Sequence, residues 1–149
     1  MNKLTEIKGF ENLTKLSFLD LSLNKIEKIK GLEPLLKLEH LNLRSNHIKK
    51  IKRLNHLVKL KYLNLSENQI SKIEEIGNLT EIENLDIYSN LITEIKGLEN
   101  LVKLKALYLA GNNISEIKGL QNAVNLTWLN MMSNHIKKEK IICMVTCSK

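Results

Sequence analysis

The chain has 149 residues, of which 43% are hydrophobic, and a formal net charge of +7. Its composition does not shift along the sequence and no linker rich in Pro, Gly or Ser interrupts it, which excludes several separate domains. No apolar run is long enough for a membrane-spanning helix, and the N-terminus lacks the layout of a signal peptide. Cys143 and Cys147 are the only cysteines, too few for a disulfide framework, so we expect inert thiols in a cytoplasmic or nuclear protein.

An asparagine recurs every 22 residues along the chain. The series is Asn2, Asn24, Asn46, Asn68, Asn90, Asn112 and Asn134. Each asparagine ends a frame that reads L-x-x-L-x-L-x-x-N-x-I in the second complete copy, which begins at Leu38. Self-similarity at a fixed period of this length is typical of a solenoid, in which each repeat stacks on its neighbours. The pattern is that of a leucine-rich repeat.

The frame divides the whole chain into repeats of one domain, residues 1–149. A partial repeat at residues 2–15 precedes five complete ones, and a degenerate repeat with a tail follows at residues 126–149. The complete repeats cover residues 16–37, 38–59, 60–81, 82–103 and 104–125. This exceeds the roughly three repeats that a stacked core needs. Neither end carries a recognisable cap, so self-association through the ends is a further expectation.

Each repeat contains one short alternating segment that predicts a half-buried strand. In the second complete repeat, Leu41 and Leu43 are expected to point inward. The asparagine follows at the bend, where its amide can satisfy backbone groups of neighbouring coils. Apolar residues then recur at every third position, which suits a 3₁₀-like segment better than a long α-helix. We therefore predict an α/β solenoid, with a curved parallel β-sheet on the concave face and short 3₁₀ or irregular convex segments.

The aromatic residues concentrate at outward strand positions, which form the concave face. Five of the six aromatics lie there: Phe18, Tyr62, Tyr88, Tyr108 and Trp128. The last three are each 20 residues apart, which predicts a diagonal row with neighbours about 8 Å apart. Exposed aromatics in such an arrangement are typical of interface hot spots. The alternative is that the rings only pack on one another.

Five polar residues and one methionine complete the predicted partner-binding surface of the concave face. Besides the aromatic residues, that surface comprises Asp20, His40, Arg44, Glu67, Asp86 and Met132. Its charges leave it near neutral or slightly acidic, whereas most lysines fall on convex positions. Nucleic-acid binding needs positive charge and stacking groups on one surface, so we do not expect nucleic acid as a partner. The densest basic run, residues 49–53, is interpreted as a solvated face, with a phosphate-binding or nuclear-import patch as the alternative.

Catalytic and metal-binding patterns are missing from the sequence. The four histidines fall at different repeat positions, and none forms a pair with the spacing of a helical metal site. Asp20 and Asp86 are three repeats apart, about 14 Å across the sheet, which is too far for a catalytic carboxylate pair. No glycine-rich phosphate loop occurs. We therefore predict no enzymatic activity, no cofactor and no metal.

Residues 29–33 (I-K-G-L-E) and 95–101 (I-K-G-L-E-N-L) resemble the 22-residue subclass typified by the leucine-rich-repeat regulatory subunit of protein phosphatase 1. This resemblance implies an intracellular adaptor whose concave face holds a globular partner, in that family the phosphatase catalytic subunit. The acidic and aromatic residues at the matching positions are Phe18, Asp20, Tyr62, Glu67, Asp86, Tyr88, Tyr108 and Trp128. Similar repeats occur in a spliceosomal A-prime protein, bacterial internalins and many microbial proteins.

The prediction from sequence is thus a non-enzymatic scaffold that binds a protein on its concave face. A regulatory adaptor of a protein phosphatase is the specific hypothesis. A microbial leucine-rich-repeat module for interaction or adhesion is one alternative. An RNA-particle component resembling the spliceosomal protein is the other, and salt-dependent RNA binding by the convex lysines would distinguish it.

Overall fold

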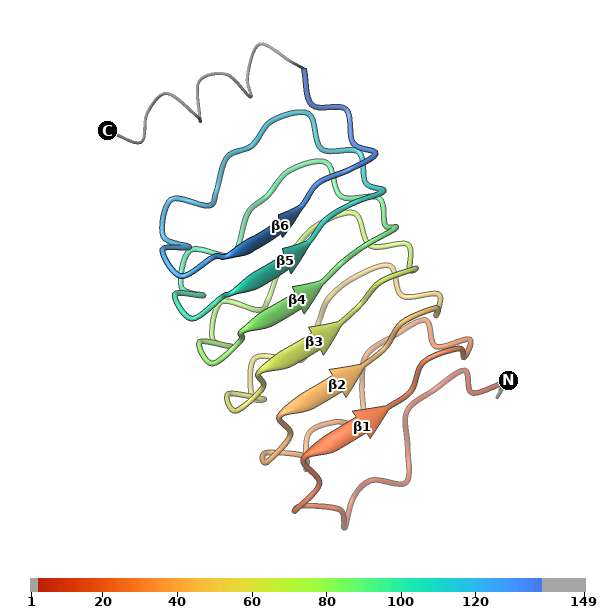
Figure 1. Ribbon diagram of the computed structural model, residues 1–149. Coiled ribbons are helices and arrows are strands. Elements are labelled where there is room, and N and C mark those ends of the chain that lie inside the picture. The colour runs from red at the N-terminus through yellow and green to blue at the C-terminus, as the bar shows by residue number, and fades with distance from the viewer. Residues whose placement is uncertain (1–2, 138–149) are drawn as a thin grey trace.

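The computed structural model describes residues 3–137, which wind into a solenoid of stacked coils (Figure 1). Asn2, Cys143 and Cys147 lie outside these residues. Each of six coils contributes one short strand to the sheet. The strands are β1 (Phe18–Asp20), β2 (His40–Asn42), β3 (Tyr62–Asn64), β4 (Asn84–Asp86), β5 (Ala106–Tyr108) and β6 (Trp128–Asn130). They form one parallel sheet in chain order, so the predicted solenoid and its sheet are confirmed.

Each strand pairs with the residues 22 positions further along the chain. Leu41 faces Leu63, and Leu63 faces Leu85, so that residues of equal repeat position stack in columns across the sheet. The three leucine side chains are fully buried. Because side chains alternate along a strand, the residues on either side of each leucine face outward and form the concave surface.

The convex segments are irregular turns, and the described residues contain no helix. Where the first complete repeat passes into the second, the backbone N–H of Leu35 donates to the carbonyl of Leu32, and that of Leu38 donates to the carbonyl of Leu35, both at 3.0 Å. These three side chains are buried, which explains why apolar residues recur at every third position. Single turns with i to i+3 hydrogen bonds thus replace a continuous 3₁₀ helix.

The recurring asparagines satisfy backbone groups that the winding of the chain turns inward. The amide nitrogen of Asn68 donates to the carbonyls of Leu43, Leu65 and Ser66 at 3.0–3.1 Å. Its amide oxygen accepts the backbone N–H of Ile48 at 2.9 Å. One side chain therefore joins its own coil to the preceding one, and similar bonds recur from Asn24 to Asn134. In the described part of the chain, no buried side-chain nitrogen or oxygen lacks a partner.

A left-handed backbone turn recurs on the convex side of the coils. Residues 9, 31, 53, 75, 97 and 119 share one repeat position, and all have positive φ. Glycine fills four of these positions, whereas Arg53 and Glu75 fill the other two. At Gly31 a Cβ atom would lie 2.3 Å from the carbonyl oxygen of Ile7 in the preceding coil. Here glycine is needed for close approach as well as for φ.

We predict that Gly31→Ala destabilises the fold more than Gly9→Ala. Gly31 and Gly9 have φ of +83° and +86°, so alanine pays a similar left-handed penalty at both, roughly 1–2 kcal/mol. Only at Gly31 does the added Cβ meet a backbone atom, because nothing lies within 4 Å of it at Gly9. Urea unfolding of the two variants measures the difference. Equal losses of unfolding free energy would contradict the role given to the carbonyl of Ile7.

We also predict that Asn68→Ala strongly lowers the free energy of unfolding. The variant leaves buried backbone groups of two coils without a partner, each of which costs about 1–3 kcal/mol. The control is Asn84→Ala, since Asn84 faces outward on β4 and is half-exposed. Urea melts should rank Asn68→Ala far below Asn84→Ala in stability. A larger loss for Asn84→Ala would mean that the repeat register is wrong.

Candidate partner-binding face

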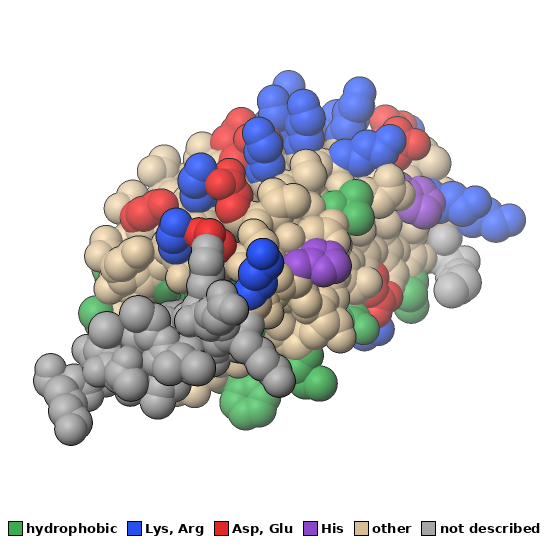
Figure 2. Space-filling view, turned by 90° about the horizontal axis from the view of Figure 1, so that it is seen from above, with side chains coloured by type: hydrophobic (Ala, Val, Ile, Leu, Met, Phe, Trp, Pro, Cys, Tyr) green, Lys and Arg blue, Asp and Glu red, His purple; other side chains and the backbone are tan. Residues whose placement is uncertain are grey.

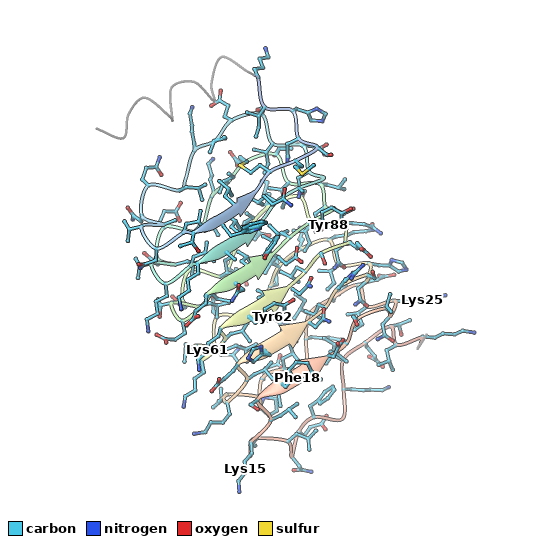
Figure 3. All side chains as sticks on the ribbon, viewed as in Figure 1. Lys15, Phe18, Lys25, Lys61, Tyr62 and Tyr88 are labelled. Carbon is cyan, nitrogen blue, oxygen red and sulfur yellow. The ribbon has the colours of Figure 1, made fainter. Side chains whose placement is uncertain are left out.

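The outward side chains of the six strands form the concave face. Figure 3 shows Phe18, Tyr62 and Tyr88 spread across the stacked coils, with Lys61 just before β3. The face has three parts. Aromatic rings lie over β1 to β3, a polar network follows over β2 to β4, and a second apolar group lies over β4 to β6.

The first part is a ladder of rings, which we call the ring ladder: Phe18, His40 and Tyr62. They occupy the same repeat position, and strand pairing places them side by side. The ring centroids of Phe18 and His40 are 6.0 Å apart, and those of His40 and Tyr62 are 5.8 Å apart. Sequence reasoning placed all three on this face but missed the stacking. The signal was their spacing of 22 residues, hidden because the middle ring is a histidine.

The polar centre is held by an ion pair between neighbouring coils. The guanidinium of Arg44 donates to Glu67 from two nitrogens, at 2.7 and 3.1 Å. The hydroxyl of Ser45, which the sequence did not single out, donates to the same carboxylate. The Arg44 bond, followed by the Ser45 bond, lowers the pKa of Glu67 below its ordinary value. Arg44 and Glu67 are therefore pre-positioned, and the centre of the face is fixed and close to neutral.

Both predicted acidic strand residues have a structural role in the turn that leaves the strand. Asp20 and Asp86 each accept the backbone N–H two residues further on, at 2.8 and 2.9 Å. Asn42, Asn64 and Asn130 make the same bond at the same repeat position. Asn and Asp side chains commonly organise turns in this way. A negative charge is thus not required for the turn.

The two aspartates titrate in opposite directions because their surroundings differ. Burial raises the pKa of Asp86, and the carboxylate of Glu67 adds to the rise; the bond from Tyr88 and the charge of Arg44 oppose it. Burial also acts on Asp20, but hydrogen bonds from Ser22 and Asn42 outweigh it and lower the pKa. Only Asp20 therefore gains from ionisation in the folded state.

The second apolar group, which we call the C-terminal apolar patch, consists of Tyr88, Tyr108, Trp128 and Met132. The rings of Tyr108 and Trp128 are 6.4 Å apart and tilted by 42°. No ring contact joins Tyr88 to Tyr108 among the described residues, so the predicted diagonal row is in contact at one step only. Trp128 is 56% exposed and Met132 is 73% exposed. The patch is therefore open to solvent.

Small residues lie between the large side chains of the C-terminal apolar patch. Ala106 pairs with Trp128 across β5 and β6. Ala110 shares one repeat position with Tyr88 and Met132, which lie 22 residues before it and 22 residues after it. Both alanines are buried. The large side chains therefore project above the small alanines, so the surface at this end of the face is uneven.

Residues 3–137 hold no group of three or more His, Cys, Asp or Glu side chains that could bind a metal ion. No helix within that range is long and apolar enough to cross a membrane. The predicted site residues thus form a surface of ring ladder, polar centre and C-terminal apolar patch. Such an arrangement supports recognition of another surface through apolar contacts around a polar centre.

Known proteins resemble this chain in sequence pattern and in fold. A family model described as "Leucine Rich repeats (2 copies)" matches residues 36–78 and 80–122. A comparison with curated proteins gave no match. Among solved structures, an internalin from Listeria monocytogenes aligns with a TM-score of 0.72 at 28% identity, over 97% of this chain and 49% of that one.

Two further structures show the same similarity. A leucine-rich-repeat protein of Leptospira interrogans aligns with a TM-score of 0.79 at 30% identity, over 86% of this chain and 34% of that one. Another Listeria monocytogenes internalin aligns with a TM-score of 0.72 at 28% identity, over 91% of this chain and 70% of that one. This chain thus spans about half the length of the first structure and about a third of the second.

We predict opposite effects of pH for the matched variants Asp86→Asn and Asp20→Asn. The pKa of Asp86 is raised in the folded state, so near this pKa the folded state binds more protons than the unfolded state. Ionisation of Asp86 therefore lowers the free energy of unfolding as the pH rises. Asp86→Asn should therefore be more stable than the parent near neutral pH, with the gain vanishing in acid. Asp20 has a lowered pKa and contributes stability above its unfolded value, so Asp20→Asn should lose stability near neutral pH.

Urea melts of both variants between about pH 3 and pH 7 measure this, because the window spans the ordinary aspartate pKa. Asparagine keeps the acceptor oxygen for the turn, as Asn42 and Asn64 do. A loss of stability near neutral pH for Asp86→Asn, equal to that of Asp20→Asn, would contradict the environments described.

Proposed function

The chain belongs to the leucine-rich-repeat family, and we propose that it is a protein-interaction module that holds a globular partner against its concave face. The proposal includes the site: the ring ladder and the C-terminal apolar patch contact the partner, and the polar centre sets its orientation. No catalytic step is part of the proposal. Leucine-rich-repeat solenoids act as scaffolds, with an open face in place of an enclosed active site.

The observation that carries the proposal is the exposure of large apolar side chains on the concave face. Phe18 is 59% exposed, Trp128 is 56% exposed and Tyr88 is 46% exposed. Covering about 100 Å² of one such ring is worth roughly 2–3 kcal/mol before the costs of association. A few rings at the two ends of the face can therefore supply most of the energy of a specific complex.

The polar centre favours one orientation of the partner over others. Arg44 and Glu67 satisfy each other across 2.7 Å, so a partner can cover them without leaving a lone buried charge. Their remaining donors and acceptors are fixed in direction by the bonds within the pair. Fixed polar groups between apolar contacts add specificity more than affinity.

Among partner classes, the similarity to internalins and to the Leptospira protein supports a microbial module for interaction or adhesion. The I-K-G-L-E segments, which are part of the resemblance to the phosphatase regulator, lie on the convex turn. Gly31, within the first of them, is needed there for close approach to Ile7. Those segments therefore report the geometry of the repeat and carry no information on the partner. We accordingly favour the microbial module over the phosphatase adaptor and the RNA-particle component.

We predict that combining Tyr88→Ala, Tyr108→Ala and Trp128→Ala abolishes capture of a protein partner and leaves the fold intact. These side chains stand outside the core, so their loss removes apolar contact area without creating a cavity. Pull-downs from a lysate of the source organism, followed by mass spectrometry, measure capture. Circular dichroism and urea melts report the fold.

The matched control combines Leu36→Ala, Val58→Ala and Val124→Ala. These side chains are 56%, 50% and 79% exposed, and they share a repeat position ahead of the strands, outside the concave face. The control variant should capture the same partner as the parent chain. Loss of the partner in the control, with retention in the aromatic variant, would move the binding site off the concave face.

A further inference from the structure

The convex side of the first and second strand-bearing coils carries a dense group of cations. Six residues, which we call the basic surface, make it up: Lys28, Lys30, Lys49, Lys50, Lys52 and Arg53. With Glu27 and Ile29 they line a shallow depression of about 510 Å³. Figure 2 shows Lys and Arg side chains gathered along one side of the molecule.

The parallel stacking of coils brings these like charges together. Lys28 and Lys50 share one repeat position, and Lys30 and Lys52 share another, so each pair is separated by about one coil spacing, near 5 Å. The fold does not need lysine there. Glu74 takes the position of Lys52 one coil later, which shows that the opposite charge is accommodated. The clustered lysines therefore repel one another, and the fold gains no stability from their charge.

Six of the thirteen other lysines in residues 3–137 form ion pairs with carboxylates, whereas only one of the five lysines of the basic surface does. Just before the strands, Lys61 bonds Glu39 at 2.8 Å, and Lys103 and Lys105 bond glutamates at 2.7 and 2.8 Å. On the basic surface, Lys30 and Arg53 reach carboxylates only at 3.7 Å. The other four lysines form no ion pair with any residue of the described range 3–137. Their charge is available to a ligand.

We propose that the basic surface binds a flexible polyanion that carries repeated sulfate or phosphate groups. One such group enters the depression, and the chain continues along the stack over the lysine columns. Neutralising several lysines at once releases bound counterions, so binding is strong at low salt and weakens steeply as salt rises.

The make-up of the basic surface disfavours nucleic acid as this polyanion. Five of its six cations are lysines, which act as point charges and lack the planar fork with which arginine reads bases. It contains no aromatic residue, so unpaired bases find no ring on which to stack. The surface fits a charge-dense chain that has no bases, because such a chain needs only cations to bind. A sulfated oligosaccharide and inorganic polyphosphate are chains of this kind.

The test measures binding of a heparin-type octasaccharide and, separately, of inorganic polyphosphate to the full chain by titration calorimetry. The variant Lys49→Gln/Lys50→Gln/Lys52→Gln is compared with the control Lys15→Gln/Lys37→Gln/Lys59→Gln. The control removes the same charge from a column at a different repeat position. We expect Kd to rise by on the order of tenfold or more in the first variant, with a shallower salt dependence. The control should change Kd by less than about threefold.

Three results would overturn the proposal. The parent chain could fail to bind either polyanion at about 0.15 M salt, where exposed charges are already screened beyond about 8 Å. The two variants could lose affinity equally, which would show that only net charge matters. Duplex DNA, single-stranded RNA or vesicles of anionic lipid could bind more tightly than both polyanions. Stronger binding of the octasaccharide than of polyphosphate, or the reverse, identifies the source of the anionic groups. The variants leave the concave face unchanged, so this test is independent of the proposed protein partner.

Discussion

The structure depends on the hydrogen bonds through which each asparagine joins two successive coils. A coil of 22 residues with a strand of three leaves many backbone groups turned inward without a ladder partner. The side chain of Asn46 donates to carbonyls of its own coil and of the coil before it, and accepts the N–H of Ile26. Since an unpaired buried group costs about 1–3 kcal/mol, a regular stack requires this amide at every turn.

Because the asparagines satisfy these groups, the outward residue that begins each strand has no structural role of this kind, whereas the residue that ends the strand still organises the turn. Leucine columns fill the core, so residues such as Phe18 and Trp128 contribute little to folding and remain exposed. The same holds on the convex side, where the repeat fixes Gly31 but leaves positions such as that of Lys52 open to either charge. The fold thus presents two independent surfaces, one apolar and aromatic, the other basic. Their separation is the basis for proposing two different kinds of ligand.

The periodicity of the sequence predicted the strands, the buried leucines and the inward asparagines because each follows from one residue position repeated in register. Properties that arise between coils were not predictable in this way. Asp20 and Asp86 occupy the same repeat position, yet their pKa values shift in opposite directions. Burial raises the pKa of Asp86, whereas at Asp20 hydrogen bonds from Ser22 and Asn42 outweigh burial and lower it. Likewise, the left-handed turns at Arg53 and Glu75 carry no glycine to mark them.

Photo-crosslinking is the most direct way to learn whether the concave face holds a protein partner. A benzophenone amino acid replaces Tyr108 in one sample and Val58 in another, and each is irradiated with a lysate of the source organism. Both positions lie outside the core, but only Tyr108 belongs to the concave sheet. We expect a protein adduct from position 108 and none from position 58. An adduct that forms only from position 58 would contradict it.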